Sequence, residues 1–136
     1  MDIVSWNVNG LPSFIESQSY KPIEALKTDV LCIQEIRVPD KIKVLDGYYH
    51  FGNPGKRNGF FGTLIMTTIK PITMIYGMGR FMPDDEVRVL TVEFEKTYIV
   101  NCYAPRSLGG LERHEYGRRW DNLLVYISNF FKKRKN

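Results

Sequence analysis

The chain has 136 residues, of which 43% are hydrophobic and 13% aromatic, so it can build one packed domain and is not a disordered tail. Lys and Arg number 19 against 15 Asp and Glu, and the formal net charge of +4 permits a polyanionic partner without requiring one. The two cysteines, Cys32 and Cys102, exclude a disulfide scaffold and a paired-cysteine zinc motif, and they fit a reducing, intracellular setting.

The first part of the chain predicts two strands joined through a short helix. The stretch MDIVSWNVNGL alternates apolar and polar side chains, which is typical of a strand that ends near Asn7 in an Asn-Gly turn. Residues 19–27, SYKPIEALK, contain a cap-like serine, an early proline and helix formers, and they predict a short helix. DVLCIQE, residues 29–35, is the second strand, so Glu35 stands where an apolar run stops.

The middle of the chain predicts a sheet. Runs rich in β-branched and aromatic residues, with Gly or Pro between them, occupy residues 47–52, 61–68 and 72–77. A further pair, EVRVLTVEFE at 86–95 and TYIVNCYAP at 97–105, ends at a proline that cannot continue a strand ladder. Because a Lys-Pro pair interrupts the most apolar region, that region is expected to be two strands and not a membrane span.

The last part of the chain predicts one long helix beginning near Leu111. Apolar residues recur there at the spacing of one helical face, at Tyr116, Trp120, Leu123, Leu124, Ile127 and Phe131. The basic KKRK run is interpreted as a solvated helix end, and a localisation signal or a DNA-contacting arm are the alternatives. No repeat, linker, signal peptide or transmembrane segment is visible, so residues 1–136 are expected to form a single domain that does not enter a membrane.

Polar side chains stand at the ends of three predicted strands. Asn7 and Glu35 end the first two strands, and Asn101 and Tyr103 stand at the end of TYIVNCY. In an α/β sheet, ligand sites are built at strand ends. One carboxylate beside amide side chains favours a hard, oxygen-liganded ion such as Mg²⁺. The alternative is that Glu35 is simply the first solvated residue after a buried run.

Other polar residues also have simple interpretations. Tyr103 is consistent with a half-buried aromatic whose hydroxyl reaches water, and residues 7–10 with an ordinary turn. His50 and His114 have no partner nearby in sequence and are interpreted as structural. Several arginines are able to contact phosphate, although most surface arginines are only solvated. They include Arg37, Arg88 and Arg106.

Five ordered blocks of the sequence are similar to one known family. They are SWNVNGL, CIQEIRV, NGFFGTLIMT, DDEVRVLTVEF and VNCYAPRSLGGLERHEYGRRWD, the last of which runs from Val100 to Asp121. In order and spacing they resemble the first half of the exonuclease III type AP endonucleases, members of the endonuclease/exonuclease/phosphatase superfamily. The resemblance covers nearly the whole chain.

The resemblance implies which residues form an active site. Glu35 matches the glutamate of the family's QE motif, a ligand of the catalytic Mg²⁺, and Asn9 is a weaker candidate near the metal. Asn7, Asn101 and Tyr103 match the family's active-site network, in which the tyrosine lies near the scissile phosphate.

Three arginines are expected to contact phosphate or DNA: Arg37, Arg88 and Arg106. Arg37 stands where the family carries a lysine, and a guanidinium differs from an ammonium in geometry. Arg106 stands where relatives often have an asparagine, so the grip on DNA is expected to differ from theirs.

The implied activity is that of a DNA repair nuclease of the AP endonuclease or 3′–5′ exonuclease type. It would hydrolyse phosphodiester bonds next to abasic sites in double-stranded DNA with Mg²⁺ as cofactor, or with Mn²⁺ in its place. The implied location is the cytoplasm or nucleoid, or the nucleus of a eukaryote.

The family motifs GDxN and SDH, which complete the site, do not occur in these 136 residues. The expected fold is therefore α/β, as the N-terminal half of a four-layer α/β sandwich, with mainly one mixed sheet, outer helices and an open inner apolar face. A complementary C-terminal half or a second copy of the chain is expected to cover that face. The alternatives are a catalytically inactive DNA-binding or interaction remnant of the fold, and a fragment of a longer enzyme.

Overall fold

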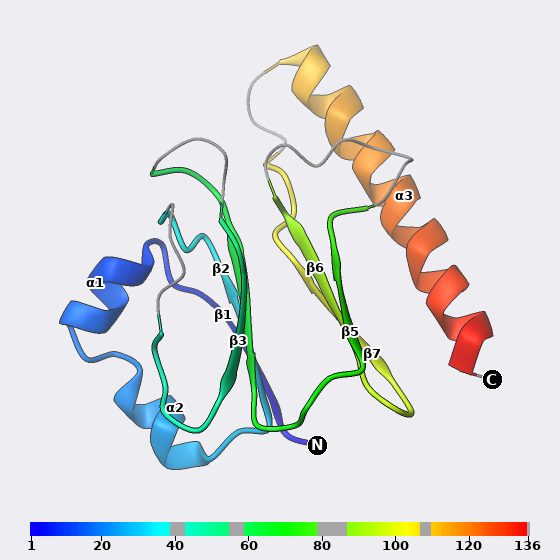
Figure 1. Ribbon diagram of the computed structural model, residues 1–136. Coiled ribbons are helices and arrows are strands. Elements are labelled where there is room, and N and C mark those ends of the chain that lie inside the picture. The colour runs from blue at the N-terminus through cyan, green and yellow to red at the C-terminus, as the bar shows by residue number, and fades with distance from the viewer. Residues whose placement is uncertain (39–42, 55–58, 79–86, 107–109, 136) are drawn as a thin grey trace.

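The computed structural model describes residues 1–38, 43–54, 59–78, 87–106 and 110–135, and it forms two sheets between outer helices (Figure 1). Glu86, at the start of one predicted strand, and residues 107–109, inside the last of the five similar blocks, lie outside these ranges. The elements in chain order are β1 (Ile3–Asn7), α1 (Leu11–Glu16), α2 (Lys21–Leu26), β2 (Val30–Gln34), β3 (Tyr49–Asn53), β4 (Thr63–Thr67), β5 (Thr73–Tyr76), β6 (Val89–Glu93), β7 (Tyr98–Cys102) and α3 (Leu111–Lys135).

The two sheets pack face to face and correct the expectation of mainly one sheet. The first sheet has the order β1-β2-β4-β3 and the second the order β5-β6-β7, with β2 and β4 lying against β6 and β7. In Figure 1, α1 and α2 cover the outer face of the first sheet, and α3 covers the outer face of the second. The α/β class and the four-layer arrangement are confirmed, whereas the inner apolar face is largely covered.

The first sheet is mixed because β1 and β2 are joined through helices. β1 pairs in parallel with β2, from Ile3 opposite Val30 to Asn7 opposite Gln34, and β4 pairs antiparallel with both β2 and β3. A parallel pair needs a crossover connection, and α1 and α2 provide it. This pairing brings the carboxyl ends of β1 and β2 side by side.

Three layers of apolar side chains hold the sandwich together. In β2, which is buried throughout, Leu31 and Ile33 face α1 and α2, whereas Val30 and Cys32 face the second sheet. A strand buried on both faces reads as a continuous apolar run, which is why VLCIQ is apolar at four successive positions. Trp120 of α3 packs on the outer face of the second sheet.

α1 was not predicted from the sequence. Its first residues carry a proline, which is compatible with a helix start, and it buries Leu11 and Phe14 against the first sheet. Gly10 precedes it with φ of +119°, a conformation that favours glycine. The Gly10 N–H donates to the Glu35 carbonyl oxygen at 2.8 Å, so this turn lies directly against the end of β2.

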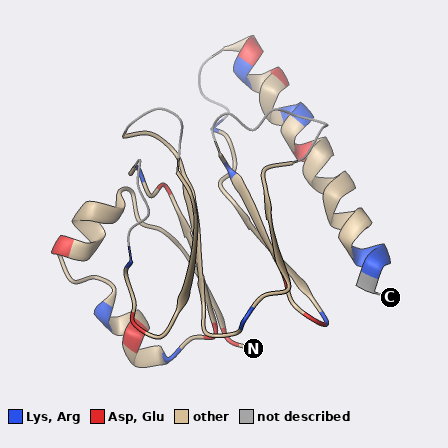
Figure 2. Ribbon diagram, in the orientation of Figure 1, with Lys and Arg blue, Asp and Glu red and all other residues tan. Residues whose placement is uncertain are grey.

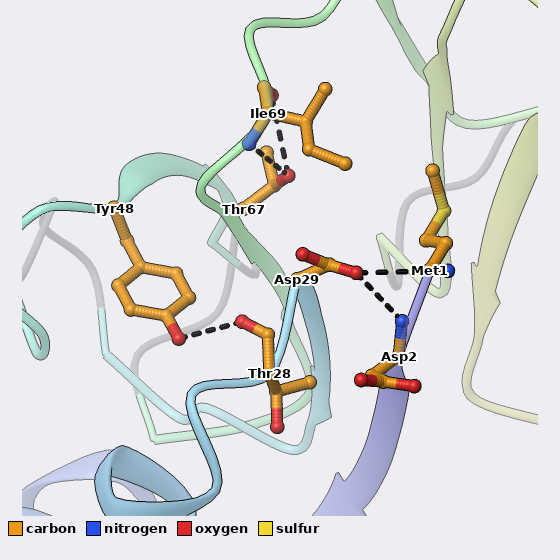
Figure 3. A network of polar contacts seen from close by, with 7 residues as sticks. All are labelled: Met1, Asp2, Thr28, Asp29, Tyr48, Thr67 and Ile69. Carbon is orange, nitrogen blue, oxygen red and sulfur yellow. Dashed lines mark hydrogen bonds and ion pairs between the residues drawn. The ribbon is translucent and has the colours of Figure 1, made fainter.

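A polar network ties down the end of the first sheet at which the chain begins (Figure 3). Asp29 Oδ2 accepts from the backbone N–H of Asp2 at 2.8 Å and lies 3.8 Å from the Met1 ammonium. Nearby, the Tyr48 hydroxyl donates to the Thr28 carbonyl at 2.6 Å. These contacts fix the start of β1 beside the start of β2, and so they help to set the register of the parallel pair.

Part of the inner face is open at β1. Ile3, Ser5 and Asn7 alternate onto the side that faces the second sheet, and Ile3 is 52% exposed. On the other side of the strand, Trp6 makes an edge-to-face contact with Phe14 of α1, with ring centroids 5.5 Å apart. Tyr76 of β5, which pairs with the inner-facing Leu90, is also 52% exposed, so the exposed inner surface lies on edge strands and is smaller than the sequence suggested.

α3 confirms the predicted long helix. It buries Trp120 and Phe131, and Phe131 stacks on Tyr98 of β7 with ring centroids 4.5 Å apart. The basic run belongs to its last turns, where Lys132, Lys133 and Arg134 are exposed. Within the described ranges, no helix is both long enough and apolar enough to cross a membrane.

Candidate active site

The predicted site residues meet at one end of the sandwich. Asn7 ends β1, Glu35 follows β2, and Tyr103 follows β7, so three strands deliver side chains to the same edge. Figure 2 shows that charged residues lie mainly in helices, loops and strand ends, and that the strand interiors carry almost none. This placement at strand ends is the usual position for a ligand site in an α/β sheet.

Glu35 is the centre of this arrangement. Its Oε1 accepts from Asn7 Nδ2 at 2.8 Å, and its Oε2 accepts from Arg37 Nη2 at 2.6 Å. The Tyr103 hydroxyl makes a further hydrogen bond with the same carboxylate. Glu35 is only 4% exposed, so it is not the solvated residue of the alternative interpretation.

The hydrogen bonds keep Glu35 ionised. Burial by itself raises the pKa of this carboxyl, because it disfavours the charged form. The hydrogen bonds from Asn7 and Tyr103, and then the hydrogen bond and charge of Arg37, outweigh burial and hold the pKa at about 2. The site therefore presents a carboxylate, not a carboxylic acid, at neutral pH.

The Tyr103 ring is held by Arg88. Arg88 Nη1 donates to the Tyr103 carbonyl at 2.9 Å, and its guanidinium lies 4.5 Å from the centroid of that ring and 4.8 Å from the centroid of Phe61. Arg88 was expected to contact phosphate, but it is only 1% exposed. In this position its side chain supports Tyr103 and does not face solvent.

Asn101 lies beneath the site, between the two sheets. Its Nδ2 donates to the carbonyls of Ile33 and Leu64, each at 3.0 Å, and its Oδ1 accepts from Gln34 Nε2 at 2.6 Å. Gln34 Nε2 also donates to Ser5 Oγ at 3.0 Å. With its amide fully used by protein groups, Asn101 is placed to position the strand ends and not to touch a substrate.

Gln34 and Phe61 were missed in the sequence analysis. The sequence did offer a sign of the role of Gln34. It ends an apolar strand and lies on the same inner face as Cys32, where a buried polar group requires a hydrogen-bond partner. The sequence offered no such sign for Phe61, since its role depends on the buried guanidinium of Arg88. His50 is structural, as predicted, because its Nε2 accepts from the N–H groups of Val44 and Leu45 at 3.1 and 3.2 Å.

Asn9 and Arg106 lie at the border of the site. The Asn9 N–H donates to Asn7 Oδ1 at 3.1 Å, so the predicted turn exists and also orients the amide that contacts Glu35. Arg106 is exposed, and its charge acts on the Tyr103 hydroxyl. Burial raises the pKa of Tyr103, the hydrogen bond and charge of Glu35 raise it further, and Arg88 and Arg106 oppose this.

Backbone strain concentrates at this edge. Of the seven non-glycine residues with positive φ in the described part of the chain, five surround the site: Asn9, Glu35, Arg37, Phe61 and Val87. Such conformations cost free energy and persist only where surrounding contacts impose them. Two hydrogen bonds help to impose these conformations here. The Arg37 N–H donates to the Phe61 carbonyl at 2.9 Å, and the Thr63 hydroxyl donates to the Val87 carbonyl at 3.2 Å.

The donor set suits a hard cation. Glu35 offers charged carboxylate oxygens, and Asn7 offers an amide oxygen that also accepts from the Asn9 backbone N–H. The described residues contain no cluster of three or more His, Cys, Asp or Glu side chains that could hold a metal ion. One carboxylate is enough for Mg²⁺, which keeps several waters and takes further oxygens from substrate phosphates.

The fold and this strand-end site define a class of two-sheet α/β sandwich proteins. The chain belongs to the Endonuclease/Exonuclease/phosphatase family, whose model matches residues 4–135. Two relatives are an exodeoxyribonuclease of Bacillus subtilis, 33% identical over 98% of this chain, and a DNA-(apurinic or apyrimidinic site) endonuclease of Dictyostelium discoideum, 38% identical over 89%. The predicted resemblance to exonuclease III type enzymes is thus confirmed.

The chain spans only part of these proteins. It covers 55% of the length of the Bacillus relative and 35% of the Dictyostelium relative. The structure of a 3′ phosphatase from Neisseria bound to a product DNA hairpin superposes with a TM-score of 0.85 over 98% of this chain and 53% of that one, at 21% identity. This last likeness concerns the fold.

Proposed function

We propose that this chain supplies part of the active site of a magnesium-dependent DNA repair phosphodiesterase of the AP endonuclease and 3′–5′ exonuclease type. The observation that carries the proposal is the ionised Glu35 carboxylate, held by Asn7 and Tyr103 where three strands end. Relatives that carry the names exodeoxyribonuclease and apurinic or apyrimidinic site endonuclease support the choice of DNA as substrate. The implied cellular location is the nucleoid or nucleus.

Glu35 is the residue that would hold the metal, with Asn9 as a weaker neighbour. When bound, Mg²⁺ supplies Lewis-acid polarisation of a phosphoryl oxygen and stabilises charge on the leaving oxygen. Asn7 fixes the rotamer of Glu35 through its amide, and the Asn9 N–H fixes the amide of Asn7 in turn. These contacts pre-organise the carboxylate.

Tyr103 and the arginines would act on the phosphate. In this role the Tyr103 hydroxyl, which donates its one proton to Glu35, would turn that O–H toward a phosphoryl oxygen bound beside the carboxylate. Arg37 and Arg106 are both exposed and offer charge-assisted hydrogen bonds to the same group. Arg88 and Asn101 act indirectly, because they hold Tyr103 and the sheet-to-sheet contact in place.

Binding of duplex DNA would depend on these exposed cations. Phosphate contacts by arginines release counterions, so affinity falls as salt concentration rises. Abasic DNA is the proposed substrate class because extruding a nucleotide without a base breaks no base pair. The net charge of +4 agrees with a polyanionic substrate.

A complementary C-terminal half is proposed as the partner that completes the site. The chain spans about half of the Bacillus relative and of the Neisseria structure, and the inner face of β1 is open at Ile3. Self-association of the chain is the competing possibility. Either partner would bury that exposed apolar surface.

The test is incision of a duplex oligonucleotide that contains one abasic-site analogue. The purified 136-residue chain is assayed with Mg²⁺ and with chelator, alone and mixed with the C-terminal half of the Bacillus relative, beside the variant Glu35→Ala. We expect Mg²⁺-dependent incision in the mixture and its loss with Glu35→Ala.

Three outcomes distinguish the possibilities. Incision by the chain alone would mean that it needs no complementary half. Incision that is equal in wild type and Glu35→Ala would refute the role of Glu35. DNA binding without incision under every condition would instead favour a non-catalytic DNA-binding module.

A further inference from the structure

Arg37 forms an ion pair with Glu35, the carboxylate that is proposed to hold the metal. Its Nη2 lies 2.6 Å from Glu35 Oε2, while Asn7 uses Oε1 at 2.8 Å. Asn7 is a neutral donor to the carboxylate, whereas Arg37 brings a full positive charge. A divalent cation on Oε2 would therefore meet the guanidinium at close range, and the two positive charges would repel each other.

The Arg37 side chain is free to leave without moving the chain. It is 40% exposed, compared with 5% for the Glu35 side chain, so only one member of the pair has access to solvent. The backbone of Arg37 stays anchored, because its N–H donates to the Phe61 carbonyl at 2.9 Å. The guanidinium can thus rotate away while both Cα positions remain fixed.

We propose that Arg37 is a place-holder cation: it occupies the Glu35 carboxylate until a divalent metal displaces it, and the released guanidinium then binds a substrate phosphate. This inference rests on the proposed metal role of Glu35. A planar guanidinium can engage a phosphate through two parallel hydrogen bonds, and a released Arg37 could turn its full set of donors toward one. Metal binding and phosphate binding are therefore positively coupled through one side chain, and the coupling is reciprocal.

The first experiment measures Mn²⁺ affinity by the electron paramagnetic resonance signal of the free ion, at fixed pH and ionic strength. It compares wild type with Glu35→Ala, Arg37→Ala and Arg106→Ala. Arg106→Ala is the matched control, since it also removes a positive charge that acts on the site but has no ion pair with Glu35. We expect Glu35→Ala to lose binding, Arg37→Ala to bind about three- to tenfold more tightly, and Arg106→Ala to change less than twofold.

These variants separate the inference from the proposed function. Unchanged Mn²⁺ affinity in Glu35→Ala, or no Mn²⁺ binding by any form, would refute the metal site itself. Loss of binding in Glu35→Ala together with equal effects of Arg37→Ala and Arg106→Ala would leave the metal site standing. In that case general charge explains the result, and the place-holder role is overturned.

A second measurement tests the released state. Binding of a duplex with an abasic-site analogue and a phosphorothioate at the scissile position is followed with and without Mn²⁺. In wild type, metal should strengthen DNA binding several-fold. In Arg37→Ala the enhancement should be smaller, because only the attraction between the bound metal ion and the DNA phosphates remains. An enhancement of equal size in both forms, or none in either, would overturn the phosphate role of Arg37.

Discussion

Gln34 Nε2 lies 2.6 Å from Asn101 Oδ1, and this hydrogen bond joins the two sheets of the sandwich directly beside the candidate site. Gln34 immediately precedes Glu35, and Asn101 lies two residues before Tyr103. A buried amide pair between the sheets therefore helps to set the distance between the carboxylate and the tyrosine. Rigid support of this kind is what a pre-organised site requires.

Asn101→Ala should destabilise the protein. It removes three hydrogen bonds and leaves the carbonyls of Ile33 and Leu64 short of a donor and the Gln34 amide short of an acceptor. Because buried polar groups without partners are costly, we expect a loss of about 2–4 kcal/mol in the free energy of unfolding, measured by urea titration. Asn122→Ala on the exposed side of α3 is the control and should change it by less than about 0.5 kcal/mol.

Glu35 should make stability depend on pH in the acid range. Its pKa is about 2 in the folded protein and near the ordinary value of 4.5 when unfolded, so the unfolded chain binds the proton more readily. The contribution is therefore fully present above pH of about 5, and it is lost as pH falls toward 2. We expect it to amount to roughly 1–3 kcal/mol after screening of the half-exposed Arg37.

The measurement is the free energy of unfolding from pH 6 to pH 2, compared with Glu35→Gln as the variant that cannot ionise. The difference between wild type and variant should shrink as the pH falls, because only wild type loses the ionised form. A difference that stays constant over this range would contradict the low pKa.

His50 should add a second pH dependence at higher pH. Burial lowers its pKa, mainly because the charged ring is desolvated, and its Nε2 accepts two backbone N–H groups only when that nitrogen carries no proton. A lowered folded pKa means that stability is present above the unfolded pKa of about 6.5 and is lost as pH falls below it. His50→Ala should remove this dependence, and exposed His114→Ala should not, in unfolding curves recorded between pH 7.5 and 5.

Arg88→Met should disturb Tyr103 although the arginine lies inside the protein. The variant keeps an unbranched side chain but loses the hydrogen bond to the Tyr103 carbonyl and the contacts with two aromatic rings. We expect a loss of about 2–3 kcal/mol in urea unfolding, against less than about 0.5 kcal/mol for exposed Arg118→Met. Equal stability of the two variants would mean that Arg88 does not support the tyrosine.

Much of the fold was predictable because its elements are encoded locally. The alternation before Asn7, the apolar run before Glu35 and the helical spacing around Trp120 each produced the observed element. α1 was missed, since a six-residue helix has little periodicity and depends on burying Leu11 and Phe14 against a distant sheet. The second sheet was also missed as a separate layer, because the sequence of a strand does not indicate which strands of another sheet it will pack against.

The sequence by itself determined the α/β class, the strand ends at which polar residues gather, and the motif residues Asn7, Glu35 and Tyr103. Tertiary structure alone decided that Arg88 is buried against Tyr103, that Asn101 joins the two sheets, and that Arg37 forms an ion pair with Glu35. The physical reason is the distance along the chain over which each kind of interaction acts. Periodicity and motifs report what neighbours in the chain require, whereas hydrogen bonds and ion pairs depend on which groups packing brings within about 3 Å of each other.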